Sequence, residues 1–211
     1  GTKNIGIGAS ALTANTTADE NTAVGDNCLA GNTTGTKNVA IGHDCMEASN
    51  ADYCTGVGFE AMKSLSGGAS NTAVGVNALF SVTTGSQNTA VGRYAGDAIS
   101  TGQYNTAMGI QALTNCTTSD FNTAIGRSAG QECTTGERNT ALGSYASWAN
   151  TTGSSNTAVG SRALDASTTS SNNVAVGYNA LTANTTGDKN ISIGKYSPIT
   201  PCMPPAVFPN K

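Results

Sequence analysis

A five-residue motif returns at a nearly fixed interval through almost the whole chain. Its clearest copy, Asn-Thr-Ala-Val-Gly at residues 71–75, recurs every 17 residues, and the step shortens to 16 only between Asn38 and Cys54. The twelve copies begin at Asn4, Asn21, Asn38, Cys54, Asn71, Asn88, Asn105, Asn122, Asn139, Asn156, Asn173 and Asn190. A strict short period without intervening sequence is typical of a solenoid, in which each repeat forms one coil that stacks on its neighbours.

Within a coil, numbered from its Asn as position 1, side-chain type follows position. Position 2 is Thr or a β-branched apolar residue and position 4 is always apolar, so the two share one face of a strand while position 3, mostly Ala, faces the other way. We expect the β-branched residues to occupy the core. Position 5 is Gly in every copy, which indicates positive φ or close backbone approach. Position 8 is small, position 9 is usually Leu or Met, and Thr-Thr-Gly at positions 13–15 is typical of a turn.

These patterns predict an all-β parallel β-solenoid (β-roll) of about twelve 17-residue coils. Frequent Gly and β-branched residues disfavour helix, and we expect two short strands and two turns per coil. Coils ~4.8 Å apart would make a rod of roughly 55–60 Å. The solenoid should span residues 1–197. All five prolines fall in residues 198–211, which we interpret as a Pro-rich C-terminal tail or cap, because proline cannot donate to a ladder.

Stacking places identical columns above one another and predicts contacts between coils. The Asn column, interrupted only at Cys54, can form an amide ladder along the rod. In the last column of the coil, Lys3, Glu20 and Lys37 alternate in sign, which favours pairing across coils.

Four of the six cysteines fall in stacked pairs. Cys28 and Cys45 both occupy position 8 of adjacent coils, and Cys116 and Cys133 both occupy position 12. Stacked Cα atoms ~4.8 Å apart lie within the range that a disulfide tolerates, so these four are disulfide candidates. The alternative is that the position-8 pair are small core residues in place of Ala.

Cys54 and Cys202 have no partner in their columns. They are either free thiols or candidates for a bridge between subunits. The even number of cysteines and their spacing favour an oxidising, extracellular setting.

Composition argues against several classes of function. A net charge of −3 with 11% charged residues predicts no nucleic-acid surface, and no apolar run approaches the ~18 residues of a membrane span. The single histidine, His43, and Asp26 occupy position 6 of two adjacent coils, and Cys45 and Cys28 occupy position 8 of the same two coils. Position 8 is expected to be core, so we predict no metal site. No catalytic residues and no cofactor are expected, and we predict that the chain is not an enzyme.

Several aromatic residues interrupt otherwise small or polar columns. Phe80, Trp148, Tyr94 and Tyr145 are the candidates for exposed contacts with a subunit or a ligand. The alternative is that they are isolated surface residues without a role.

Two copies of the motif carry a family resemblance. Asn38–Gly42 (Asn-Val-Ala-Ile-Gly) and Asn173–Gly177 resemble the Asn-x-Val-Ala-Ile-Gly element of YadA-type head repeats in trimeric autotransporter adhesins. The longer unit is similar to the Asn-Thr-Ala-Val-Gly repeats of phage tail-fibre and secreted surface proteins. The resemblance covers residues 1 to about 197. It implies a left-handed parallel β-roll, often trimeric, with adhesive or structural duty on a cell or virion surface.

We therefore expect a structural protein, the subunit of an extracellular fibre or filament, and a homo-oligomer (filament or trimer). One version joins subunits head to tail through the solenoid ends, because the chain starts in repeat register and ends in the Pro-rich segment. The alternative is an adhesin head or phage tail-fibre segment that binds a cell-surface glycan or protein. A lesser alternative, ice binding, follows from the regular Thr columns, although one of them is expected to face inward.

Overall fold

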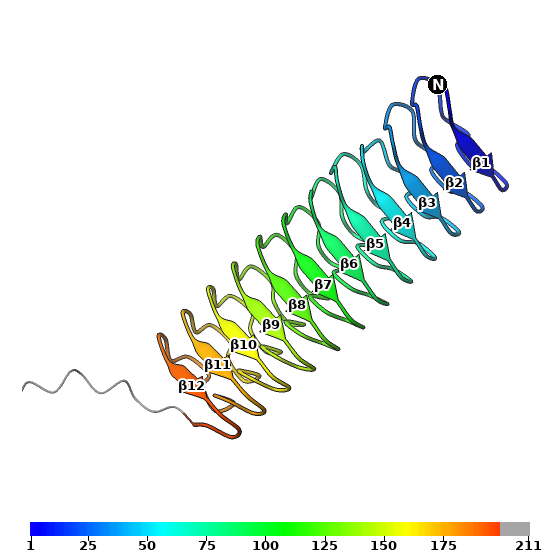
Figure 1. Cartoon of the computed structure of the whole chain (residues 1–211). Coiled ribbons are helices and arrows are strands. Elements are labelled where there is room, and N and C mark those ends of the chain that lie inside the picture. The colour runs from blue at the N-terminus through cyan, green and yellow to red at the C-terminus, as the bar shows by residue number, and fades with distance from the viewer. Residues whose placement is uncertain (199–211) are drawn as a thin grey trace, which may run out of the picture.

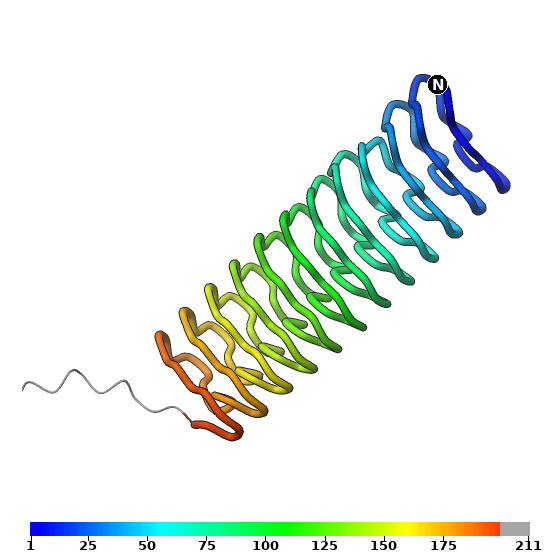
Figure 2. Tube along the Cα trace, in the orientation of Figure 1, coloured from blue at the N-terminus to red at the C-terminus, as the bar shows by residue number. Residues whose placement is uncertain are grey.

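The computed structural model describes residues 1–198, in which the chain winds into a straight rod (Figures 1 and 2). Predictions for the tail beyond Pro198, including Cys202, lie outside the described residues. Each coil contributes one three-residue strand: β1 (Ile5–Ile7), β2 (Thr22–Val24), β3 (Val39–Ile41), β4 (Thr55–Val57), β5 (Thr72–Val74), β6 (Thr89–Val91), β7 (Thr106–Met108), β8 (Thr123–Ile125), β9 (Thr140–Leu142), β10 (Thr157–Val159), β11 (Val174–Val176) and β12 (Ile191–Ile193).

The twelve strands form one parallel sheet in chain order, which confirms the predicted β-solenoid. Each strand pairs with residues 17 further on, as in Thr72↔Thr89, and 16 further on only where Val39 meets Thr55. The sequence period is therefore the register of the sheet.

The prediction of two strands per coil was wrong, because the described coils contain one each. Residues at positions 7, 9 and 17 have a left-handed backbone conformation even where they are not glycine. Examples are Asn77 (φ 55°), Leu79 (φ 51°) and Gln87 (φ 59°). A strand needs extended backbone, so these residues curve the rest of the coil. Backbone hydrogen bonds still join the curved parts, as from Leu79 N to Ala95 O (3.0 Å).

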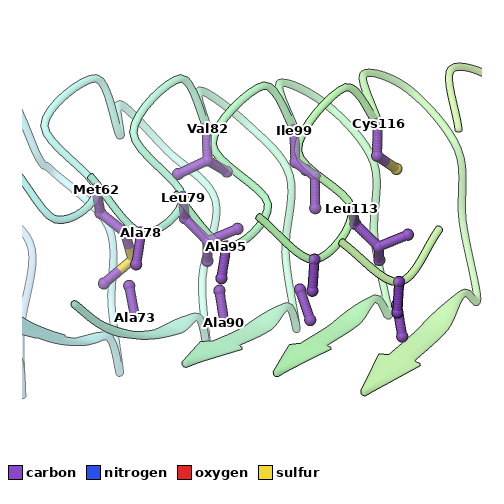
Figure 3. Close-up of a cluster of buried hydrophobic side chains, with 14 of the residues drawn as sticks. Met62, Ala73, Ala78, Leu79, Val82, Ala90, Ala95, Ile99, Leu113 and Cys116 are labelled. Carbon is purple, nitrogen blue, oxygen red and sulfur yellow. The ribbon is translucent and has the colours of Figure 1, made fainter. Parts of the chain in front are cut away.

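The core is filled by positions 3, 8, 9 and 12, not by the β-branched positions 2 and 4 (Figure 3). Ala73, Ala78, Leu79 and Val82, one from each position of one coil, are fully buried. The coil is too narrow for a second layer of large side chains beneath the strand. Where Cys45 stands at position 8, a Cβ atom on Gly56 would lie 2.7 Å from its Sγ, so strand β4 has Gly in place of Ala. The inward face of the strand therefore takes Ala, and the larger β-branched side chains point outward.

The glycine at position 5 satisfies both conditions that the sequence suggested. Its φ lies between 125° and 141° in all twelve coils. A Cβ on Gly75 would also lie 2.6 Å from the carbonyl oxygen of Gly92 in the next coil. No other residue type fits this corner without strain.

The Asn column forms the predicted ladder inside the rod. Asn105 is typical: its backbone N–H donates to Asn88 Oδ1 (3.0 Å), and its own Oδ1 accepts from the backbone N–H of Asn122 (2.9 Å). Its Nδ2 donates to Ser119 O (2.7 Å) across the coil. Each buried amide thus ties two neighbouring coils together and closes its own coil. At the interruption, Asn71 N donates to Cys54 Sγ at 3.4 Å instead.

The 16-residue step is absorbed in the Thr-Thr-Gly turn. In other coils the turn N–H groups donate to a backbone carbonyl of the next coil, as from Thr83 N to Ser100 O (2.9 Å). In the short coil the side chain of Asn50 takes over, and its Oδ1 accepts from Thr33 N (2.8 Å) and Thr34 N (3.3 Å). The side-chain carbonyl of Asn50 therefore supplies the acceptor that a backbone carbonyl supplies in other coils, and the register of the sheet is unchanged.

Candidate functional site

The outward-facing side chains of the sheet form a continuous surface along the rod, which we call the outer sheet face: positions 2 and 4 of strands β1–β12. Position 4 is apolar in every strand, and Val74, Met108 and Ile125 are exposed there. Position 2 carries seven consecutive threonines, from Thr55 to Thr157, all of them half-buried. No charged residue occupies either column. Parallel sheets are usually covered on both faces, and monomers rarely expose apolar patches beyond a few hundred Å².

Position 6 borders the outer sheet face and is mixed in character. Val76 and Ile110 are exposed and extend the apolar surface, whereas Arg93 and Arg127 stand in the same column. His43 and Phe59 stack with ring centroids 5.5 Å apart. The uncharged face therefore has a partly polar rim, as protein interfaces do.

A separate hollow lies beyond the strands, at coils nine and ten. We call it the Trp148 pocket; it has a volume of about 270 Å³ and is lined by Tyr145, Trp148, Arg162 and Asp165. These are positions 7 and 10 of two adjacent coils, so stacking brings the four side chains around one hollow. Trp148 is exposed, and its Nε1–H donates to Gln131 Oε1 (3.3 Å).

The four aromatic candidates differ in their placement. Trp148 is exposed and Tyr145 is half-buried beside it in the pocket, so the structure brings these two together. Phe80 and Tyr94 are half-buried in other coils.

A second aromatic group, which the sequence pattern did not single out, lies in the last column of the coil. Tyr104 and Phe121 are exposed and stack with centroids 4.8 Å apart, and the Arg138 guanidinium lies 5.5 Å from the Phe121 ring. The sequence did hold a signal for this group, because side chains of the last column were predicted to pair across coils. Lys3 and Glu20 of the same column form that predicted ion pair (3.0 Å).

The stacked cysteines are free thiols in the core, not disulfides. Cys28 Sγ donates to Ala40 O (3.1 Å), and Cys116 Sγ lies 2.6 Å from Ser119 Oγ. A hydrogen bond with Cys28, together with burial, raises the pKa of the Cys45 thiol, so it stays protonated and unreactive at neutral pH. The alternative interpretation of the position-8 pair as small core residues describes what is seen.

Cys54 is poorly placed for the bridge between subunits that the sequence suggested. Its side chain is 1% exposed and substitutes for an amide in the Asn ladder. Burial raises its pKa. A partner chain could reach this sulfur only if the coil opened.

The cluster around His43 does not bring its ligand types together. His43 Nε2 lies 3.9 Å from Asp26 Oδ2 and Nδ1 lies 3.3 Å from Asp44 Oδ1, whereas the thiols of Cys28 and Cys45 face the core. Across residues 1–198, no three His, Cys, Asp or Glu side chains are placed to hold a metal ion. The same residues contain no helix long and apolar enough to cross a membrane.

The surroundings of Asp97 disfavour the charged form of its carboxyl group. Its Oδ1 is buried without a hydrogen-bond partner. Desolvation raises its pKa to about 6, against hydrogen bonds from the backbone N–H groups of Ala98 and Asp97. The folded state therefore binds a proton that the unfolded chain releases near its ordinary pKa of 3.8, and stability is lost as pH rises from about 4 through about 6.

We expect Asp97→Asn to stabilise the rod by about 1 kcal/mol near pH 7 and to leave stability unchanged near pH 4. The shift alone corresponds to about 3 kcal/mol, which we discount because the side chain is only half-buried. Urea unfolding at the two pH values measures the difference. An equal stabilisation at both would show that the charge of Asp97 is not the cause.

No family model, curated protein or solved structure matches this chain.

Proposed function

We propose that this chain is a rod-shaped structural segment of an extracellular or virion-surface fibre, and that copies associate side by side through the outer sheet face. The observation that carries the proposal is the uncharged, largely apolar column of side chains that runs along all twelve strands. Water contact along such a column is unfavourable, and covering it with a second surface would stabilise the assembly.

Another copy of the same chain is the partner that fits this surface best. The side chains repeat at the spacing of the strands, ~4.8 Å, and a second identical sheet has the same spacing over the same length. Residues of one copy can then fall between residues of the next along the whole rod. A globular partner would match this period only locally.

The outer sheet face is large enough for a stable contact. Twelve strands of three residues cover about 55 Å by about 10 Å, or roughly 550 Å² on each copy. A specific interface needs about 1,000 Å² in total, roughly 500 Å² from each partner. The face meets this size, and threonine hydroxyls at position 2 can form hydrogen bonds within it.

The internal construction of the rod supports a mechanical role. Every described coil is joined to the next through the parallel sheet, and most are joined again through the buried Asn ladder. The resemblance of the repeat to surface-adhesin heads and tail fibres points the same way. The head-to-tail arrangement stays a prediction, because the Pro-rich segment lies outside the described residues.

Charging the outer sheet face tests the assembly. The double variant Met108→Lys/Ile125→Lys places two ammonium groups in adjacent strands, β7 and β8, where association would bury them. We expect the wild type to sediment as an oligomer and the variant as a monomer, because an unpaired buried charge costs several kcal/mol. Analytical ultracentrifugation measures the masses.

The matched control is Gln103→Lys, an exposed residue in the stretch before β7. This control should sediment as the wild type does. A monomeric wild type, or an oligomer that survives in the double variant, would contradict the proposal.

Ice binding is a second candidate that the structure strengthens. The expectation that the strand threonines face inward was wrong, since Thr55 to Thr157 lie in the outer sheet face. A flat, regular array of hydroxyl and methyl groups can order water on its surface. Thermal hysteresis from a monomeric wild type, abolished in Met108→Lys/Ile125→Lys, would favour this function over assembly. The absence of thermal hysteresis would rule out ice binding.

A further inference from the structure

The Trp148 pocket combines features that the other coils do not bring together. Tyr145 and Trp148 come from coil nine, and Arg162 and Asp165 come from coil ten at the same two positions. An exposed indole therefore stands beside a hollow whose remaining wall is a guanidinium and a carboxylate. None of the four belongs to a strand, so the pocket is distinct from the outer sheet face.

The two charged groups of the pocket, Arg162 and Asp165, do not form an ion pair with each other. Within the described chain, neither Arg162 nor Asp165 forms an ion pair. The same two positions are used differently in coils three and four, where Lys63 pairs with Asp44 and Glu60, each at 2.8 Å. The backbone N–H groups of Asp165 and Ala166 donate to the Asp165 carboxylate, and the hydrogen-bonding capacity that remains on Asp165 and Arg162 is left for a ligand.

The environment of these groups favours a polar but uncharged ligand. Burial raises the pKa of the Asp165 carboxyl, which Arg162 partly opposes, so a hydroxyl donor would stabilise its charged form. Arg162 lies 5.7 Å from the Tyr145 ring and Arg127 lies 4.5 Å from it, so the phenol is held between two guanidinium groups. The aromatic wall is therefore braced in place.

We propose that the Trp148 pocket binds a single pyranose ring of a saccharide. The apolar C–H face of the ring would stack on Trp148, and adjacent hydroxyls would donate to Asp165 and accept from Arg162. A carboxylate and a guanidinium together satisfy both hydrogen-bonding roles of a hydroxyl pair. A volume of about 270 Å³ lies just below the range of drug-sized sites and suits one ring.

This assignment deepens the adhesin alternative and does not depend on side-by-side assembly. Trp148 is the only tryptophan in the chain, so its fluorescence reports on the pocket alone. The probes are the methyl glycopyranosides of glucose, galactose, mannose and N-acetylglucosamine, titrated into the full chain. We expect at least one to give a saturable change in emission with a dissociation constant on the order of 1–10 mM.

Two variants of similar shape, Asp165→Asn and Arg162→Gln, should each weaken the binding of that sugar by about 10- to 100-fold. This is the effect expected for loss of a hydrogen bond to a charged group. The matched control is Asp97→Asn, the same position of coil six, where an aromatic residue, Phe80, also precedes it by one coil. It should bind as the wild type does. Saturation-transfer NMR with Trp148→Ala, which should abolish the signal of the sugar, gives a readout independent of fluorescence.

No saturable response to any of the four sugars would overturn the assignment. An equal response in Asp165→Asn and the wild type would overturn it too. Sedimentation of Asp165→Asn separates the two proposals, because loss of sugar binding should leave assembly through the outer sheet face unchanged.

Discussion

Gly75→Ala is expected to destabilise the rod by about 3–5 kcal/mol. The residue has φ of 138°, a region that an alanine adopts only with strain of about 1–3 kcal/mol. The new Cβ would also lie 2.6 Å from the carbonyl oxygen of Gly92, and that atom belongs to the backbone of the next coil and cannot turn aside. Overpacking of this kind adds about 1–3 kcal/mol. Chemical denaturation followed by circular dichroism measures the loss.

Gly67→Ala is the matched control. Gly67 has no atom within 4 Å of the position that its Cβ would take, and its φ is not positive. We expect a change within about 0.5 kcal/mol. If the two variants lost equal stability, the stacked glycine column would not be the constraint that the geometry indicates. Both must be measured at one protein concentration, because association couples to stability.

Asn105→Ala is expected to cost about 2–5 kcal/mol. Truncation leaves the buried N–H of Asn122 without its acceptor and removes the donor to Ser119 O. A buried polar group that loses its partner costs about 1–3 kcal/mol. The side chain is 1% exposed, so water cannot readily replace either bond. Thermal and urea unfolding measure the effect.

The opposite change is available in the same column. Cys54 occupies the Asn position with a weak sulfur acceptor, 3.4 Å from Asn71 N. Cys54→Asn would restore an amide oxygen toward Asn71 and an amide donor toward Gly68 O, which the thiol reaches only at 3.5 Å. We expect a gain of about 1 kcal/mol. A loss in this variant, or no loss in Asn105→Ala, would mean that the ladder adds little to stability.

The sequence predicted those features that follow from stacking alone. Identical positions of successive coils lie above one another, so a column of one residue type describes a contact of that residue with itself. The Asn ladder, the Gly75 corner and the Lys3–Glu20 pair were all accessible in this way. The position of the short coil was also visible, although the compensation by Asn50 needed coordinates.

Only half of the Trp148 pocket could be predicted from the sequence. Tyr145 and Trp148 stand out because aromatic residues are rare in their columns, but Arg162 and Asp165 look like ordinary surface charges. Which positions of neighbouring coils share a hollow depends on how the curved part of the coil folds. The left-handed residues that shape it, such as Tyr145 and Ser147, carry no sequence signal, because they are not glycine.

The sequence by itself determined that this chain is a parallel β-solenoid with a register of 17 residues, because only stacking keeps such a period. Alternation in Thr72-Ala73-Val74 also determined that the strand has two different faces. Only the tertiary structure decided which face is inside. The narrow coil buries the small side chain of Ala73 and leaves Val74 exposed, so the larger side chains form the outer surface on which the proposed assembly rests.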